Sequence, residues 1–107
     1  MFKGFSRASL SPPRVAILGA GIIGLSIAFE LVFRRGTRVT LFDTRPCGRG
    51  ASWAAAGMIA PAFEAAAEAG VHPRLFDLCL ESAGLWPDFS ADIERLSGLP
   101  SGFEPAP

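Results

Sequence analysis

Three glycines near the start of the chain, and one acidic residue further on, have the spacing of a phosphate-binding site. Gly19, Gly21 and Gly24 form a GxGxxG pattern, and Asp43 follows 19 residues after the last of them. Gly19 permits a tight turn, Gly21 lets the backbone approach a pyrophosphate, and Gly24 lets a helix pack closely on a strand. Asp43 can accept hydrogen bonds from a ribose hydroxyl, whereas it would repel a 2′-phosphate. The pattern therefore predicts a dinucleotide site and disfavours NADP.

The residues around these glycines predict the elements that must position them. Residues 15–19 (VAILG) are a continuous apolar run, long enough for a strand buried on both faces. Residues 25–35 have helical spacing, with two arginines in the last turn and Gly36 as the cap. Residues 39–43 (VTLFD) predict a second, parallel strand, so the helix N-terminus faces the phosphates. The alternative is that the glycines only form a turn and bind no ligand. The strand before them, the helix after them and the acidic residue at the end of the second strand argue against that alternative.

A membrane span is a competing interpretation of the same segment. Residues 15–33 carry a single charge, Glu30, and have arginines at both ends. Three glycines and a strand-like beginning fit a turn better than a lipid-facing helix, and the next apolar run begins only a few residues later. The sequence therefore argues against a membrane span.

A second motif, residues 50–61 (GASWAAAGMIAP), distinguishes FAD from NAD, which the glycine pattern alone does not. A flavin is a broad planar ring that needs backbone donors along its edge, and side chains larger than a methyl would hold the main chain away. Ala56 and Gly57 suit that approach, and Ser52 offers a hydroxyl to a phosphate. The structural alternative is an alanine-rich helix that starts after Ser52.

Together the two motifs resemble the D-amino-acid oxidase-type family of flavoproteins, and within it the glycine oxidases. The resemblance covers residues 15–61 closely and extends loosely to residues 85–89 (LWPDF). It implies FAD as the cofactor and an α/β fold: a Rossmann-type FAD-binding βαβ unit followed by a long helix, an incomplete part of a larger flavoprotein fold. The residues implied to bind FAD are Gly19, Gly21, Ile22, Ile23, Gly24, Asp43, Thr44, Ala51, Ser52, Ala56, Gly57 and Met58.

The resemblance also implies a role for each part of this set. Asp43 and Thr44 would hold the adenosine ribose; the amides of Ile22 and Ile23, together with Ala51 and Ser52, would meet the phosphates; Ala56, Gly57 and Met58 would run beside the isoalloxazine ring. The chain departs from the family pattern twice. The family commonly has Glu at the position of Asp43, which is one methylene shorter, and a small residue at the position of Trp53.

The activity implied by the resemblance is oxidation of a small amine or amino acid, such as glycine, to an imine, with oxygen as the second substrate and hydrogen peroxide as a product. Such an oxidase would serve thiamine biosynthesis. The family's substrate-anchoring arginine and tyrosine come from later segments, and this chain has no tyrosine, so we name no catalytic residue. We expect an N-terminal part that is inactive alone, with its C-terminal part missing or present as a separate chain. The alternatives are a non-enzymatic docking subunit and the NAD-binding module of a dehydrogenase.

The remainder of the chain predicts helices. Residues 63–70 predict a short surface helix or loop, and the residues from Pro73 to Gly98 predict a long amphipathic helix. Pro87 should kink or divide that helix, with Asp88 as a cap of the second half. Its apolar stripe consists of Leu75, Cys79, Ser82, Trp86, Phe89, Ile93 and Leu96. The organisation we expect is a disordered extension over 1–14, the FAD-binding part over 15–61, and a truncated helical segment of the same domain over 62–107.

Composition excludes several other functions. The net charge is zero, although residues 1–60 hold eight basic and two acidic side chains and residues 61–107 the reverse. A nucleic-acid binder that relies on a broad basic field is therefore disfavoured. A single histidine and two cysteines without CxxC spacing nearly exclude a His/Cys metal site and favour reduced thiols in a cytoplasmic protein. The N-terminus lacks the apolar stretch of a secretion signal.

Overall fold

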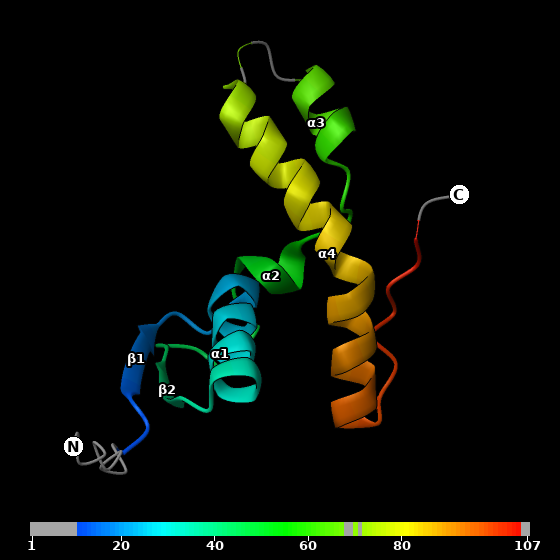
Figure 1. Ribbon diagram of the computed structural model, residues 1–107. Coiled ribbons are helices and arrows are strands. Elements are labelled where there is room, and N and C mark those ends of the chain that lie inside the picture. Colours follow the sequence, from blue (N-terminus) through cyan, green and yellow to red (C-terminus); the bar gives the residue numbers. More distant parts are fainter. Residues whose placement is uncertain (1–10, 68–69, 71, 106–107) are drawn as a thin grey trace, which may run out of the picture. The chain divides into compact units, whose positions relative to one another are not determined.

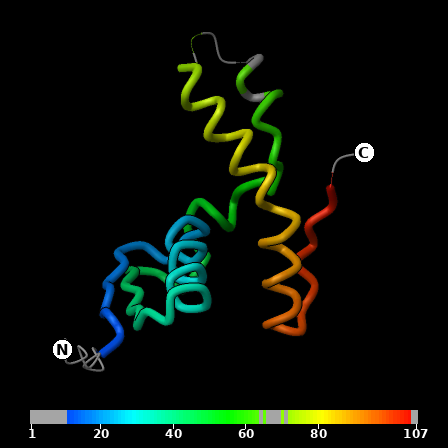
Figure 2. The backbone as a smooth tube through the Cα atoms, viewed as in Figure 1, coloured from blue at the N-terminus to red at the C-terminus, as the bar shows by residue number. Residues whose placement is uncertain are grey.

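The computed structural model describes residues 11–67, 70 and 72–105 (Figure 1). The chain forms two compact units that join in sequence between Ala56 and Gly57, a little before the boundary expected after residue 61. Figure 2 follows the backbone through the first unit, from blue to green, and through the second, from green to red. Residues 1–10 of the expected extension lie outside the described residues, and Arg14 already belongs to a strand.

The first unit is built on two parallel strands joined by a helix. β1 (Arg14–Leu18) pairs with β2 (Arg38–Phe42), and Leu18 lies beside Phe42 at their carboxyl ends. The connection is α1 (Ile22–Arg35). Parallel strands require such a crossover, so the predicted βαβ unit is confirmed and the chain is α/β. The strands each begin one residue earlier than predicted, and the helix begins three residues earlier.

The sheet is buried on one face only, which differs from the expectation of strands buried on both. Exposure alternates along each strand: Val15, Ile17, Val39 and Leu41 are half-buried, and their neighbours are exposed. Within the described residues of this unit, α1 is the helix that packs on both strands. Because α1 can cover only one face, Leu18 and Phe42 remain 86% and 55% exposed.

The helix α1 owes its position to small residues on its inner face. Gly24 and Ala28 are its buried residues. Its C-terminus is closed as predicted by Gly36, whose φ of 62° is left-handed. The amide of Gly36 donates to the carbonyl of Val32, and the amide of Thr37 donates to the carbonyl of Leu31. Two of the last carbonyls thus find partners, and a glycine supplies the conformation that this ending needs. After β2 the unit ends with α2 (Ala51–Ala54), a single turn.

The second unit is helical. It contains α3 (Pro61–Ala67) and α4 (Pro73–Ser97), which pack against each other. α3 confirms the short helix expected here. His72 precedes α4 and accepts a hydrogen bond from the Arg74 amide through Nδ1 at 3.2 Å, and Gly98 ends the helix in the left-handed conformation.

Pro87 does not divide α4, and the expectation that Asp88 caps a second helix is wrong. The helix is continuous through both residues. It changes direction near its middle (Figure 1), as expected where a proline removes one hydrogen bond and its ring displaces the preceding turn.

After α4 the chain turns back along the helix. Glu94 accepts hydrogen bonds from both the amide and the hydroxyl of Ser101, at 2.9 and 2.7 Å. The ring of Phe103 stacks on Trp86, with 6.2 Å between the ring centres. We call residues 99–105 the return segment. It fixes Trp86, which also lines an apolar groove of about 810 Å³ between α3 and α4.

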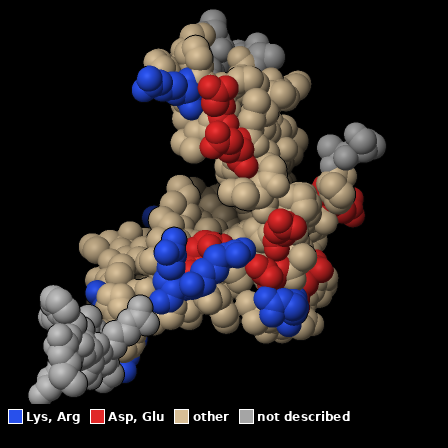
Figure 3. Space-filling view, viewed as in Figure 1, with Lys and Arg blue, Asp and Glu red and all other residues tan. Residues whose placement is uncertain are grey.

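The surface carries the charge asymmetry of the sequence. Figure 3 shows basic side chains gathered on the first unit and acidic side chains along the second. Within the described part of the chain, no helix combines the length and the apolar character that crossing a membrane requires. The thiols of Cys47 and Cys79 are both free and exposed.

Candidate functional site

The site begins where β1 turns into α1. Gly19 has a φ of 109°, which L-residues with a side chain rarely adopt. Its amide donates to the carbonyl of Phe42 at 2.7 Å, so the turn is fastened to the end of β2. Ala20, the next residue, is only 2% exposed. The tight turn expected at Gly19 is therefore present and rigidly held.

Gly24 has a steric role. A Cβ built on this residue would overlap the carbonyl oxygen of Gly19 and would lie 3.4 Å from Ile17. The first turn of α1 therefore lies directly on the loop and on β1, and only glycine permits this approach. The close contact of helix and strand predicted for the third glycine is what the structure shows.

Asp43 bridges the glycine turn and the chain that follows β2. Its Oδ2 accepts the amide of Ala20 at 2.8 Å, and its Oδ1 accepts the amide of Arg45 at 2.9 Å. The Ala20 bond, followed by the Arg45 bond, lowers the pKa of the Asp43 carboxyl below its ordinary value of 3.8. The group is therefore a carboxylate at neutral pH. Each oxygen has further lone pairs, and the side chain is exposed, so it can still accept hydrogen bonds from a ligand.

The second motif reaches the same turn through Ser52. Its hydroxyl oxygen accepts the amide of Ile22, the first residue of α1, at 2.8 Å. The oxygen also lies 3.1 Å from the position that a Cβ on Gly21 would occupy. The structure thus brings together Gly21, Ile22 and Ser52, which the sequence placed in two separate motifs.

Two shallow hollows flank the turn at the carboxyl ends of the strands. One has about 480 Å³ and lies between the start of α1 and α2; its lining includes Ile23, Ala51 and Ser52. The other has about 410 Å³ and is lined by Leu18, Gly19, Phe42, Asp43 and Thr44. In α/β proteins, dinucleotides bind at this edge of the sheet. The two hollows share Leu18 and Gly19, so an elongated ligand can cross the glycine turn from one to the other.

The remaining predicted residues are divided between the units. Ala56 ends the first unit, and Gly57 and Met58 begin the second. Gly57 has a φ of 76°, so this position favours glycine irrespective of any ligand. Met58 is 70% exposed. The flavin-side contacts inferred for these residues remain predictions.

Sequence reasoning missed several participants. The Ala20 amide, which holds Asp43, follows from no local pattern, because its partner lies 23 residues away. The bond from Arg45 to Asp43 could have been predicted, since Asp often accepts the amide two residues on. The Arg49 guanidinium lies 3.6 Å from the centre of the Trp53 ring, so the unusual Trp53 has a cation partner at the surface.

Comparison with known proteins agrees with this geometry. A family profile described as FAD dependent oxidoreductase (DAO) matches residues 14–105. The chain is 41% identical over 91 residues to a bifunctional protein ThiO/ThiG of Trichormus variabilis, which covers 85% of this chain and 13% of that protein. It is 40% identical over 88 residues to a glycine oxidase of Geobacillus kaustophilus, covering 82% of this chain and 22% of that enzyme.

A further relative matches a shorter part of the chain. A tryptophan 2-monooxygenase of Pantoea agglomerans pv. gypsophilae is 51% identical over 51 residues, which is 47% of this chain and 9% of that enzyme. No solved structure is significantly similar to the chain. The chain spans less than a quarter of the length of each of these three relatives.

Proposed function

Since this chain belongs to the D-amino-acid oxidase-type family of FAD-dependent oxidoreductases, we propose that it is the FAD-binding part of an oxidase for a small amine or amino acid. The observation that carries the proposal is the glycine turn, which is held between β1, α1 and Asp43 and has a hollow on either side. The names of relatives, among them glycine oxidase, support the substrate class. An NAD-binding module is less well supported, because the family is FAD-dependent.

The residues of the turn suit the two halves of FAD. The adenosine ribose would bind at Asp43 and Thr44, in the hollow beyond the strand ends. The pyrophosphate would lie against the start of α1, where the Ile23 amide and the positive end of the helix dipole favour anions. The Ile22 amide, also predicted to meet the phosphates, donates to Ser52 Oγ in this structure. The Ser52 hydroxyl keeps its own proton, which it would donate to a phosphate. Ala51 and Ser52 line the hollow between the start of α1 and α2. We assign the flavin end to the chain around Ala56, Gly57 and Met58. FAD bound there would supply the acceptor for a hydride.

The activity of the whole oxidase is part of the same proposal. We infer oxidative deamination of glycine or another small amine, with oxygen as co-substrate and hydrogen peroxide as product, in a cytoplasmic thiamine pathway. We name no catalytic residue in this chain. We expect no turnover from the chain alone, because it spans less than a quarter of the length of the oxidases and bifunctional proteins that it matches.

Two assays test the proposal. Protein purified in excess FAD and NAD should retain the yellow flavin and exclude NAD; retention of NAD instead would contradict the cofactor assignment. A peroxide assay with glycine and a panel of D-amino acids should then be run on the chain alone and with the products of neighbouring genes. Peroxide from an active assembly is expected, and an assembly that binds FAD but oxidises no amine would rule out the oxidase.

A further inference from the structure

The three glycines of the turn are not required for the same reason. Gly19 needs its left-handed φ of 109°, and a side chain on Gly24 would collide with the backbone of Gly19. Gly21 has φ −80° and ψ −174°, which is extended backbone that any residue adopts. The conformation of Gly21 therefore does not explain why this position is glycine.

The nearest obstacle to a side chain at Gly21 is Ser52. A Cβ there would lie 3.1 Å from the hydroxyl oxygen of Ser52, closer than ordinary van der Waals contact. That oxygen cannot move away without cost, because it accepts the Ile22 amide at 2.8 Å. The hydrogen bond between Ile22 and Ser52 joins residues 30 positions apart, so it is a tertiary contact and not a consequence of the local turn.

The same hydroxyl fills a role that helices usually assign to the preceding residue. The first amides of a helix have no partner within it, and a Ser, Thr, Asp or Asn side chain at the N-cap position commonly accepts one of them. Gly21 occupies that position in α1 and has no side chain to do so. A side chain at Gly21 would accept the amide of the second or third helical residue. Ser52, from the single turn α2, instead accepts the amide of the first, Ile22.

We propose that Ser52 is a positioning residue, a tertiary cap that fastens residues 50–56 onto the start of α1. We propose also that Gly21, whose lack of a side chain would let a pyrophosphate approach, leaves room for this cap. The proposal deepens the proposed function, on which it rests for its purpose: the cap holds the second cofactor-binding segment against the phosphate end of the first before any cofactor binds. A site that is preorganised in this way loses less freedom when its ligand arrives.

The cap is tested on the full chain without cofactor, by NMR measurement of amide-proton exchange with water. In Ser52→Ala the exchange of the Ile22 amide should accelerate about fivefold, which corresponds to one ordinary hydrogen bond. The Leu25 amide, which donates to the carbonyl of Gly21, should change little and is the internal control. Ser52→Thr keeps a hydroxyl and should restore slow exchange, and Ser82→Ala in the second unit is the matched control.

A double-mutant cycle tests the role of Gly21. Gly21→Ala should accelerate exchange at Ile22 in the unmodified chain, because the new methyl displaces the Ser52 hydroxyl. In the Ser52→Ala background the same change should have almost no further effect, since the obstacle is gone. An equal effect of Gly21→Ala in both backgrounds would show that Gly21 is needed for another reason and would overturn the proposal.

The remaining outcomes are also decisive. If Ser52→Ala exposes every amide of the first unit and Ser52→Thr restores them, the hydroxyl has the role proposed. If the amides of the first unit lose their protection in both Ser52→Ala and Ser52→Thr, the cap is overturned. It is also overturned if the Ile22 amide exchanges equally fast in Ser52→Ala and in the unmodified chain. FAD is absent throughout, so a chain that shows the cap but fails to retain FAD would contradict the proposed function and leave the cap standing.

Discussion

The two units of this chain are held by contacts of different range. In the first, the hydrogen bonds that shape the glycine turn join residues 23 and 30 positions apart: the Ala20 amide donates to Asp43, and the Ile22 amide donates to Ser52. In the second, the return segment is held by bonds across 7 and 11 positions, from Glu94 and Ser90 to Ser101. A site built on long-range contacts exists only when its unit is folded, whereas local contacts can be lost one at a time. Substitutions at matched positions in the two units should therefore have different effects.

The largest contrast is expected between two helical glycines. Gly24→Ala places a methyl on the backbone of Gly19 and should destabilise the first unit by about 2 kcal/mol or more. Gly84→Ala in α4 meets no atom within 4 Å and should stabilise its helix by about 0.5–1 kcal/mol. Chemical denaturation followed by circular dichroism measures both. A Gly24→Ala chain as stable as the unmodified one would refute the close packing of α1 on the turn.

The next contrast concerns two carboxylates and pH. Hydrogen bonds from Ala20 and then Arg45 lower the pKa of Asp43, and those from the Ser101 amide and hydroxyl lower the pKa of Glu94. A lowered pKa means that the stabilisation is complete above the ordinary values of 3.8 and 4.5 and is lost as pH falls through the lowered values.

An NMR titration from neutral to acid pH reads out both groups. The amides of Ala20 and Ser101 should shift only in the acid range, below the ordinary pKa of the carboxylate that each contacts. In Asp43→Asn, the NMR signal of either the Ala20 or the Arg45 amide should lie, already at neutral pH, where it lies in the unmodified chain at acid pH. The reason is that a carboxamide has one acceptor oxygen for two donors. Glu94→Gln should alter Ser101 alone. Transitions at or above the ordinary values would contradict the bonding described.

A smaller effect is expected in the return segment. Phe103→Ala removes the ring that stacks on Trp86 and should cost the second unit about 1 kcal/mol, without changing the glycine turn. Trp86 fluorescence, recorded in a Trp53→Phe background, should shift to longer wavelength as the ring becomes exposed. An unchanged spectrum would place Phe103 away from Trp86.

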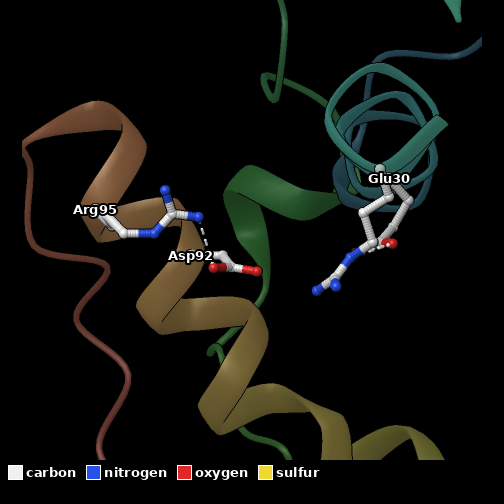
Figure 4. A network of polar contacts seen from close by, with 4 residues as sticks. Glu30, Asp92 and Arg95 are labelled. Carbon is white, nitrogen blue, oxygen red and sulfur yellow. Dashed lines mark hydrogen bonds and ion pairs between the residues drawn. The ribbon is translucent and has the colours of Figure 1, made fainter. Parts of the chain in front are cut away.

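The smallest effects should come from the surface ion pairs. Figure 4 shows Glu30 on α1 and the pair Arg95–Asp92 on α4. The Arg34–Glu30 and Arg95–Asp92 distances are 2.8 and 2.9 Å; the arginine side chains are 52% and 66% exposed, and those of Glu30 and Asp92 are 44% and 31% exposed. Exposed pairs of this spacing contribute about 0.3–0.5 kcal/mol. Glu30→Gln and Arg95→Gln should therefore change the free energy of unfolding by about that amount in either unit, and less in high salt. A cost above about 1 kcal/mol would contradict this reading.

Sequence was sufficient for the βαβ unit because its signals are local. Apolar runs of strand length, a glycine turn and Gly36 at the helix end each report on their own backbone, and all were recovered with ends displaced by one to three residues. At Pro87 the sequence predicted a kink or a division, and the helix bends and continues, because a proline excludes only one hydrogen bond; the cap expected at Asp88 was wrong.

The contacts that complete the site could not be read from the pattern. The hydrogen bond from the Ile22 amide to Ser52 depends on how residues 50–56 fold back over the turn. No hydrophobic periodicity in the sequence predicts that fold. The same is true of Asp43, whose position at a strand end predicted a ligand contact but not its bond to Ala20. Motif spacing thus predicted the glycine turn and the strand end that carries Asp43, whereas the hydrogen bonds that join them to each other and to Ser52 required the structure.

The central claim is that a dinucleotide rests on the glycine turn, and an FAD titration of the full chain followed by NMR tests it most directly. The amides of Gly19, Ile22 and Ile23 should shift and saturate with FAD, those of α4 should not, and Gly24→Ala should abolish the response. FAD that leaves the amides of the turn unperturbed, or that perturbs α4 instead, would contradict the account.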